Sequence, residues 1–176
     1  GLTNAIKLYY INKSYAISVF DTINKWDVSN VTNMKDIWLS QLKVNKDINK
    51  WDVSKVTNMS NMFTDCQFSE EVDLSNWDVS NVTNMSNMFQ NCILNKGSDI
   101  SKWKVGNVTN MSNMFNYSET FNQDISGWNV GNVTNMNGMF QNANFNQDIS
   151  KWNTSKVTNM SNMFYRSFFN NPINTR

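Results

Sequence analysis

The chain contains no histidine, and this absence excludes several kinds of active site. Without histidine there is no Ser-His-Asp triad, no Cys-His dyad and no histidine metal site. The two cysteines are too few to form a zinc site by themselves. The six glycines form no glycine-rich phosphate loop. We therefore expect a protein that is not an enzyme and that holds no cofactor or metal.

Long apolar runs and a strong charge of either sign are also missing. No stretch of about 18 consecutive apolar residues occurs, so we expect no insertion into a membrane. The formal net charge is +1, which gives no reason to expect nucleic acid as a partner. No signal peptide is visible, and the chain begins with Gly1 rather than Met, as a processed or recombinant chain would. The sequence itself therefore carries no signal for localisation.

What the chain has in abundance is a tandem repeat. Each copy begins with tryptophan and continues with nearly the same string, which in the third copy reads W-D-V-S-N-V-T-N-M-S-N-M-F from Trp77 to Phe89. The first copy departs most, because Ile37 and Trp38 stand where later copies have Met and Phe. The six tryptophans are spaced 25, 26, 26, 25 and 24 residues apart: Trp26, Trp51, Trp77, Trp103, Trp128 and Trp152. Six copies in register predict a repeat architecture.

The apolar spacing within a copy predicts its local structure. Val79, Val82, Met85 and Met88 fall every three residues, which fits a 3₁₀-like or extended segment with three residues per turn. A loop of variable length follows, and the segment D-I-S-G-W at 124–128 is interpreted as a short strand. A unit of about 25 residues is too small to fold alone, so the copies must stack. We expect a repeat solenoid with one short parallel β-strand and one short helical or 3₁₀ turn per copy, the strands about 4.8 Å apart.

The repeats divide the chain into three parts. Residues 1–20 are rich in apolar residues and have no internal Gly or Pro, which predicts an N-terminal cap of one or two short helices. Residues 21–169 form the six-repeat solenoid, and residues 170–176 form a C-terminal tail. No cap is evident after the last copy, which leaves open that the natural protein continues past Arg176.

The repeated string, with F-N-Q-D-I-S before it, resembles the BspA-like, mycoplasma-type surface-protein repeat. That family is catalogued as a domain of unknown function and is grouped with leucine-rich repeats. The resemblance covers about residues 21–169 and implies a leucine-rich-repeat-like solenoid. Because the family occurs in bacterial surface lipoproteins and adhesins, it also implies a cell-surface or extracellular location. Members in large DNA viruses leave a virion-associated protein as a second reading. The family offers no catalytic residues to carry over.

The columns of apolar residues have two readings each. Six stacked tryptophans predict a core, with an exposed aromatic strip for a carbohydrate or protein as the alternative. The Met and Phe columns also predict core rather than a flexible Met-rich binding groove. The Asn columns favour a ladder of amides that satisfies backbone groups at the bend of each coil. For the Thr column, a flat array that orders water is the rival reading.

A column of aspartates supplies the candidate contact residues. Like charges about 5 Å apart repel by roughly 1 kcal/mol each in water, so something must offset them. Hydrogen bonds to backbone N–H groups of the preceding loop, bound cations such as Ca²⁺, or a basic partner would each do so. The predicted contact positions are these aspartates and the outward serines beside them: Asp73, Asp99, Asp124, Asp148, Ser75, Ser101, Ser126 and Ser150.

Cys66 and Cys92 occupy the same position in adjacent copies, where other copies have Ser or Ala. Two readings follow, buried thiols or a disulfide between neighbouring coils.

The function that fits these patterns is a recognition or adhesion module presenting an elongated surface to a protein or glycan partner. Positions that differ between copies, such as Tyr117, Tyr165 and Arg166, would add specificity. The alternative is a structural spacer, stalk or virion component with no specific ligand.

Overall fold

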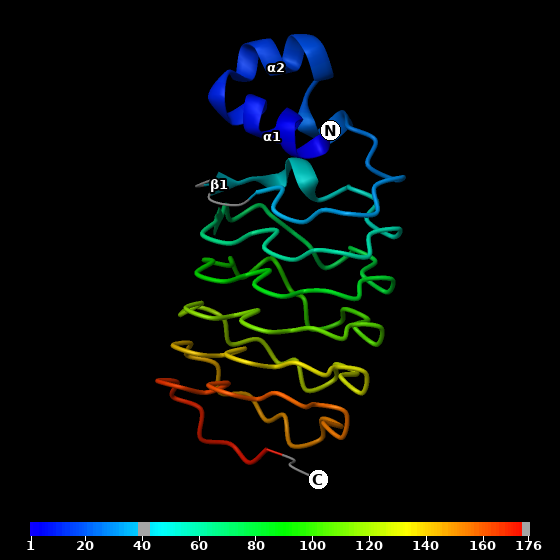
Figure 1. Ribbon diagram of the computed structural model, residues 1–176. Helices are drawn as coiled ribbons and strands as arrows, with labels where there is room; N and C mark the ends of the chain where they lie inside the picture. The colour runs from blue at the N-terminus through cyan, green and yellow to red at the C-terminus, as the bar shows by residue number, and fades with distance from the viewer. Residues whose placement is uncertain (39–42, 174–176) are drawn as a thin grey trace.

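The computed structural model describes residues 1–38 and 43–173. Two helices, α1 (Leu2–Ile11) and α2 (Lys13–Phe20), lie at the N-terminal end. Beyond them each repeat makes one turn of chain, and these turns are stacked along one axis toward the C-terminus (Figure 1). They are called coils 1 to 6 below, and each begins at one of the six repeat tryptophans.

The helices form where apolar residues recur at helical spacing. Ile6 and Tyr9 of α1 and Ala16 of α2 are buried. Asn12 separates the two helices, and its side chain accepts a hydrogen bond from the Tyr15 N–H at 3.1 Å, as an N-cap residue does. The ring of Tyr9 meets that of Trp26 edge to face at 6.3 Å, so the helical pair packs on coil 1.

Regular secondary structure is sparse in the coils. Two 3₁₀ helices occur, η1 (Ile23–Lys25) and η2 (Lys46–Ile48). Two strands of two residues each, β1 (Lys43–Val44) and β2 (Gln67–Phe68), pair in parallel with Lys43 opposite Gln67 and Val44 opposite Phe68.

Successive coils are linked by a line of parallel backbone bridges at the asparagine of the V-T-N-M string. The Met85 N–H donates to the Asn110 carbonyl at 2.9 Å, and the Thr109 N–H donates back to the Thr83 carbonyl at 2.9 Å. The side chain of this asparagine also binds its own backbone: Asn84 Oδ1 accepts from the Ser86 N–H at 2.9 Å. The bridged residues are Asn33, Asn58, Asn84, Asn110, Asn135 and Asn159.

The segment interpreted as a strand is a turn instead. Within residues 124–128, Asp124 Oδ1 accepts a hydrogen bond from the Ser126 N–H at 3.0 Å, which closes a tight local turn. The alternation of apolar and polar residues there resembles a strand, but an aspartate can bond to the backbone two residues on and so competes with strand pairing.

Left-handed backbone accounts for six of the asparagines: Asn61, Asn87, Asn91, Asn113, Asn142 and Asn162. Two positions in each of coils 2 to 6 have φ near +55°, a region where Asn and Asp are tolerated better than most residues. The first is the second asparagine of N-M-S-N-M-F, as in Asn87 (φ 56°), and the second lies four residues later, as in Asn91 (φ 49°).

The core runs the length of the stack. In coil 4 the side chains of Val105, Val108, Met111, Met114 and Phe115 are at most 1 % exposed. Phenylalanine rings from successive coils stack on one another with centroids 5.7 Å apart at Phe63–Phe89, Phe89–Phe115 and Phe115–Phe140. The Met, Phe and Val columns therefore lie inside the stack.

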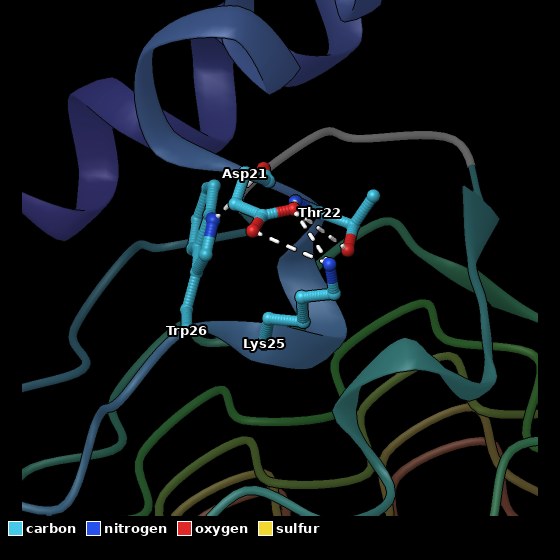
Figure 2. A network of polar contacts seen from close by, with 4 residues as sticks. All are labelled: Asp21, Thr22, Lys25 and Trp26. Carbon is cyan, nitrogen blue, oxygen red and sulfur yellow. Dashed lines mark hydrogen bonds and ion pairs between the residues drawn. The ribbon is translucent and has the colours of Figure 1, made fainter.

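The tryptophans of coils 2 to 6 are also buried, and each reaches back one coil. Trp103 Nε1 donates to the Leu74 carbonyl at 2.9 Å, and Trp128 Nε1 donates to the Ile100 carbonyl at 3.1 Å. Trp26 has no coil before it, and its indole N–H donates to the Asp21 carbonyl at 3.1 Å (Figure 2). Asp21 also bonds Thr22 and Lys25, so the segment after α2 supplies what a preceding coil would (Figure 2).

The divergence of the first repeat has a structural reason at the helices. Trp38 takes the place of the repeat phenylalanine and stacks on Phe63 with ring centroids 5.7 Å apart. Its indole N–H donates to the Tyr10 hydroxyl of α1 at 3.2 Å, and that hydroxyl donates to the Lys43 carbonyl at 2.7 Å. Desolvation by burial raises the pKa of Tyr10.

Coil 6 differs from the others because nothing stacks on its far side among the residues that the structure describes. Val157, Met160 and Phe164 are partly exposed, although their counterparts in coil 4 are fully buried. The chain after residue 169 continues in register: the Asn170 N–H donates to Asn146 Oδ1 at 3.0 Å, just as the Asn146 N–H donates to Asn122 Oδ1 at 2.9 Å. The tail expected at residues 170–176 thus follows the path of another coil as far as it is described.

Candidate functional site

The predicted aspartates lie at equivalent turns of coils 2 to 5 and are called the acidic row: Asp73, Asp99, Asp124 and Asp148. Each carboxylate accepts a hydrogen bond from the N–H of the serine two residues later, at 2.9 Å in Asp99 and 3.0 Å in Asp124. The expected bonding to backbone N–H groups is present, but the donor lies after the aspartate and not in the loop before it. The serine partners are Ser75, Ser101, Ser126 and Ser150.

These hydrogen bonds favour the ionised form of three carboxylates of the row. The side chain and backbone N–H of the serine lower the pKa of Asp99, Asp124 and Asp148 below the usual range of an aspartate. Repulsion between coils is present as well, since Asp148 acts to raise the pKa of Asp124, while Lys102 acts to lower it. The offset to like-charge repulsion therefore comes from serine donors and neighbouring lysines.

Two shallow grooves flank the middle of the acidic row. A groove of 470 Å³ is lined by Asp99, Ser101 and Asp124, with Leu94 and Phe121 as apolar contributors. A second groove of 400 Å³ lies beside it and shares Ser101. Asp73, Ser75, Ser126, Asp148 and Ser150 lie outside both grooves. The structure thus brings three of the eight predicted contact residues together at one groove and spreads the others along the stack.

A second acidic row was not predicted as a candidate. The aspartates directly after the tryptophans of coils 1 to 3, Asp27, Asp52 and Asp78, make the same turn: Asp52 Oδ1 accepts from the Ser54 N–H at 3.0 Å. Hydrogen bonding by the paired serine lowers the pKa of all three. The signal was the D in the W-D-V-S string, and it ends where Lys104 takes that position in coil 4.

The two cysteines are buried thiols, and the described residues show no cluster of metal ligands. Within residues 1–38 and 43–173, no group of three or more His, Cys, Asp or Glu side chains is arranged to hold a metal ion. Cys66 is a buried thiol that donates to the Trp38 carbonyl with Sγ at 3.2 Å. Cys92 is a buried thiol too, and desolvation raises its pKa well above the usual value, which suppresses the nucleophilic thiolate.

Comparison with protein families gives a match over nearly the whole chain. The family described as "Mycoplasma protein of unknown function, DUF285" matches residues 7–96 and again residues 92–176. The chain belongs to this family. The first DUF285 match begins inside α1, and the second continues through coil 6.

The DUF285 assignment carries no activity with it. Searches of curated proteins and of solved structures gave no significant match. No helix in the described part of this DUF285 chain is long and apolar enough to cross a membrane.

Proposed function

We propose that this DUF285 chain is a non-catalytic recognition or adhesion module, which presents the side of its stacked coils to a protein or glycan partner. The observation that carries the proposal is the acidic row beside the 470 Å³ groove. Its carboxylates are held by backbone hydrogen bonds at equivalent positions of successive coils, so they form an ordered and ionised line. Such a line is suited to a partner with regularly spaced cations or hydrogen-bond donors.

The class of fold is part of the same proposal. We assign the stack to leucine-rich-repeat-like solenoids of the BspA-like kind. Support comes from the repeat spacing of 24 to 26 residues, the parallel bridge at each coil and the continuous core. A cell-surface or extracellular location, or a virion-associated one, is proposed from the resemblance of the repeat string to such proteins.

A structural spacer or stalk is the second candidate, and the regularity of the stack favours it. Successive coils are joined by parallel bridges at equivalent asparagines and share one continuous core. A spacer of this kind would associate end to end and would bind no ligand saturably.

The experiment is a binding screen of the purified chain against glycans and surface proteins, with and without Ca²⁺. The key variant is the triple substitution Asp99→Asn, Asp124→Asn and Asp148→Asn. Asparagine keeps the Oδ1 acceptor that closes each turn and removes only the charge. We expect the variant to fold normally and to lose the partner.

The second acidic row provides a matched control. Asp27→Asn, Asp52→Asn and Asp78→Asn together also remove three charges from turns of the same geometry. Loss of the partner in the first triple variant and retention in the control support the proposal. Equal losses would indicate non-specific attraction, and no saturable partner in either calcium condition would favour the spacer.

A further inference from the structure

A separate groove crosses coils 4, 5 and 6 and shares no lining residue with the two grooves beside the acidic row. It has a volume of 340 Å³ and is lined by two residues from each coil: Tyr117, Glu119, Asn142, Asn144, Arg166 and Phe168. Tyr117 is 50 % exposed and Phe168 is 78 % exposed. These side chains are not part of the repeated core.

Two of these residues have a backbone conformation that does not suit them. Tyr117 (φ 58°) and Arg166 (φ 55°) are left-handed, at the position where the equivalent residues are Asp65, Asn91 and Asn142. The stack imposes this conformation on Tyr117, since the Tyr117 N–H donates to the Gln141 carbonyl at 2.9 Å in the same way that the Asp65 N–H donates to the Gln90 carbonyl. Asn and Asp tolerate left-handed backbone better than Tyr or Arg. Backbone outliers of this kind cluster at binding and catalytic sites.

Contacts within the protein hold the polar side chains of the groove in place and leave some of their hydrogen-bonding groups for a ligand. The Arg166 guanidinium lies over the Tyr165 ring at 5.2 Å, which holds it in place by a cation–π contact. Across residues 1–38 and 43–173, the ion pairs are Lys25–Asp21 and Lys46–Glu71, so no carboxylate there pairs with Arg166. Asn144 Nδ2 donates to the Glu119 carbonyl at 2.9 Å, which fixes the wall of the groove and leaves the Asn144 side-chain oxygen as an acceptor.

We propose that this groove binds a sugar that carries a carboxylate. The weakly positive C–H face of a pyranose packs on the electron-rich face of an aromatic ring, which Tyr117 offers. A guanidinium pairs with a carboxylate through two parallel hydrogen bonds, which Arg166 offers. Glu119 accepts from sugar hydroxyls, whereas it repels a ligand with many carboxylates, such as an acidic peptide. The inference deepens the proposed recognition function and rests on it, but it uses other residues than those of the acidic row.

The test is calorimetric titration of the purified chain with oligosaccharides that carry a single galacturonic, glucuronic or sialic acid residue and are otherwise neutral. A neutral galactose oligosaccharide of equal length and a triglutamate peptide are compared with them. We expect saturable binding of at least one acidic sugar, with the neutral sugar and the peptide at least tenfold weaker. Tighter binding of triglutamate, or no binding of any acidic sugar, would overturn the proposal.

The substitution Tyr117→Asn separates ligand binding from structure. It installs the residue that coil 5 has at this position, so it relieves backbone strain and raises Tm by about 2–4 °C. Affinity for the acidic sugar falls at least tenfold, as it does in Arg166→Gln. Tyr15→Ala is the control, because Tyr15 is an exposed tyrosine of α2 outside the groove, and it leaves affinity unchanged. Unchanged affinity in Tyr117→Asn and Arg166→Gln would contradict the inference.

The acidic-row variant distinguishes this inference from the function it rests on. Asp99→Asn, Asp124→Asn and Asp148→Asn together leave sugar affinity within twofold. If a partner binds through the acidic row and no sugar binds, the acidic-sugar proposal is wrong and the recognition function stands. If no ligand binds saturably, both the acidic-sugar proposal and the recognition function are wrong.

Discussion

Coils 4 and 6 have nearly the same repeat residues in very different surroundings. Met111 and Phe115 of coil 4 are fully buried, whereas the equivalent Met160 and Phe164 of coil 6 are partly exposed. The Phe115 N–H donates to the Met139 carbonyl at 2.9 Å, but no described residue accepts from the Phe164 N–H. Burial and backbone pairing are therefore properties of the stack and not of the repeat itself, as expected when each repeat interacts only with its neighbours.

The largest expected difference in stability between coils 4 and 6 concerns the phenylalanine stack. Phe115→Ala leaves a cavity between coils 3 and 5 and should lower the free energy of unfolding by about 3–5 kcal/mol. Phe164→Ala should cost about half of that or less, because water already reaches the ring. Urea unfolding followed by tryptophan fluorescence measures both. Equal losses would mean that coil 6 is as well packed as coil 4.

The next effect concerns the indole hydrogen bonds. Trp103→Phe removes the donor to the buried Leu74 carbonyl, and an unpaired buried acceptor costs about 1–3 kcal/mol. Trp26→Phe should cost less, because its acceptor at Asp21 lies at an exposed residue where water can replace the indole. The same unfolding measurement compares the two, and a larger loss at Trp26 would contradict the explanation.

A smaller effect tests the left-handed positions. Asn87→Ala should cost about 1 kcal/mol, because alanine tolerates a φ of 56° less well than asparagine. The loss should be smaller for Asn162→Ala (φ 58°), since the Asn87 N–H is held by the Ser112 carbonyl and the Asn162 N–H has no such acceptor in the described part of the chain. Thermal unfolding followed by circular dichroism measures both variants. If Asn87→Ala loses no stability, the left-handed backbone does not explain why asparagine occupies this position.

The smallest effect is the response to acid. Asp99, Asp124 and Asp148 have a folded pKa below the unfolded value, so their stabilising contribution is present above about pH 4 and is lost as the pH falls through the folded pKa. Replacing all three with Asn should make Tm less dependent on pH between pH 5 and pH 2. A variant with unchanged acid sensitivity would show that the row contributes nothing to it.

Spacing along the sequence was informative about the apolar columns and poor about polar turns. Three-residue spacing identifies Val105, Val108 and Met111 because side chains that share a face must recur regularly. It does not show that Asp124 closes a turn onto Ser126, because that outcome depends on a side chain bonding its own backbone. The parallel bridges at Asn84 and its equivalents are not predicted either, because backbone pairing at a single residue leaves no alternation of side chains in the sequence.

The candidate site was predictable only where it repeats. The acidic row recurs and is predicted from the sequence. The second acidic row recurs in three coils, so the sequence also carries the signal needed to predict it. The strain at Tyr117 is invisible in sequence, because it depends on a backbone conformation that the neighbouring coil imposes.

The direction of the indole hydrogen bonds has a consequence for how the chain is made. Every repeat tryptophan donates to a carbonyl earlier in the sequence, as Trp51 does to Ile23 and Trp152 to Ile125. A newly synthesised coil therefore finds its acceptor already in place. We expect vectorial growth, with each finished coil as the template for the next.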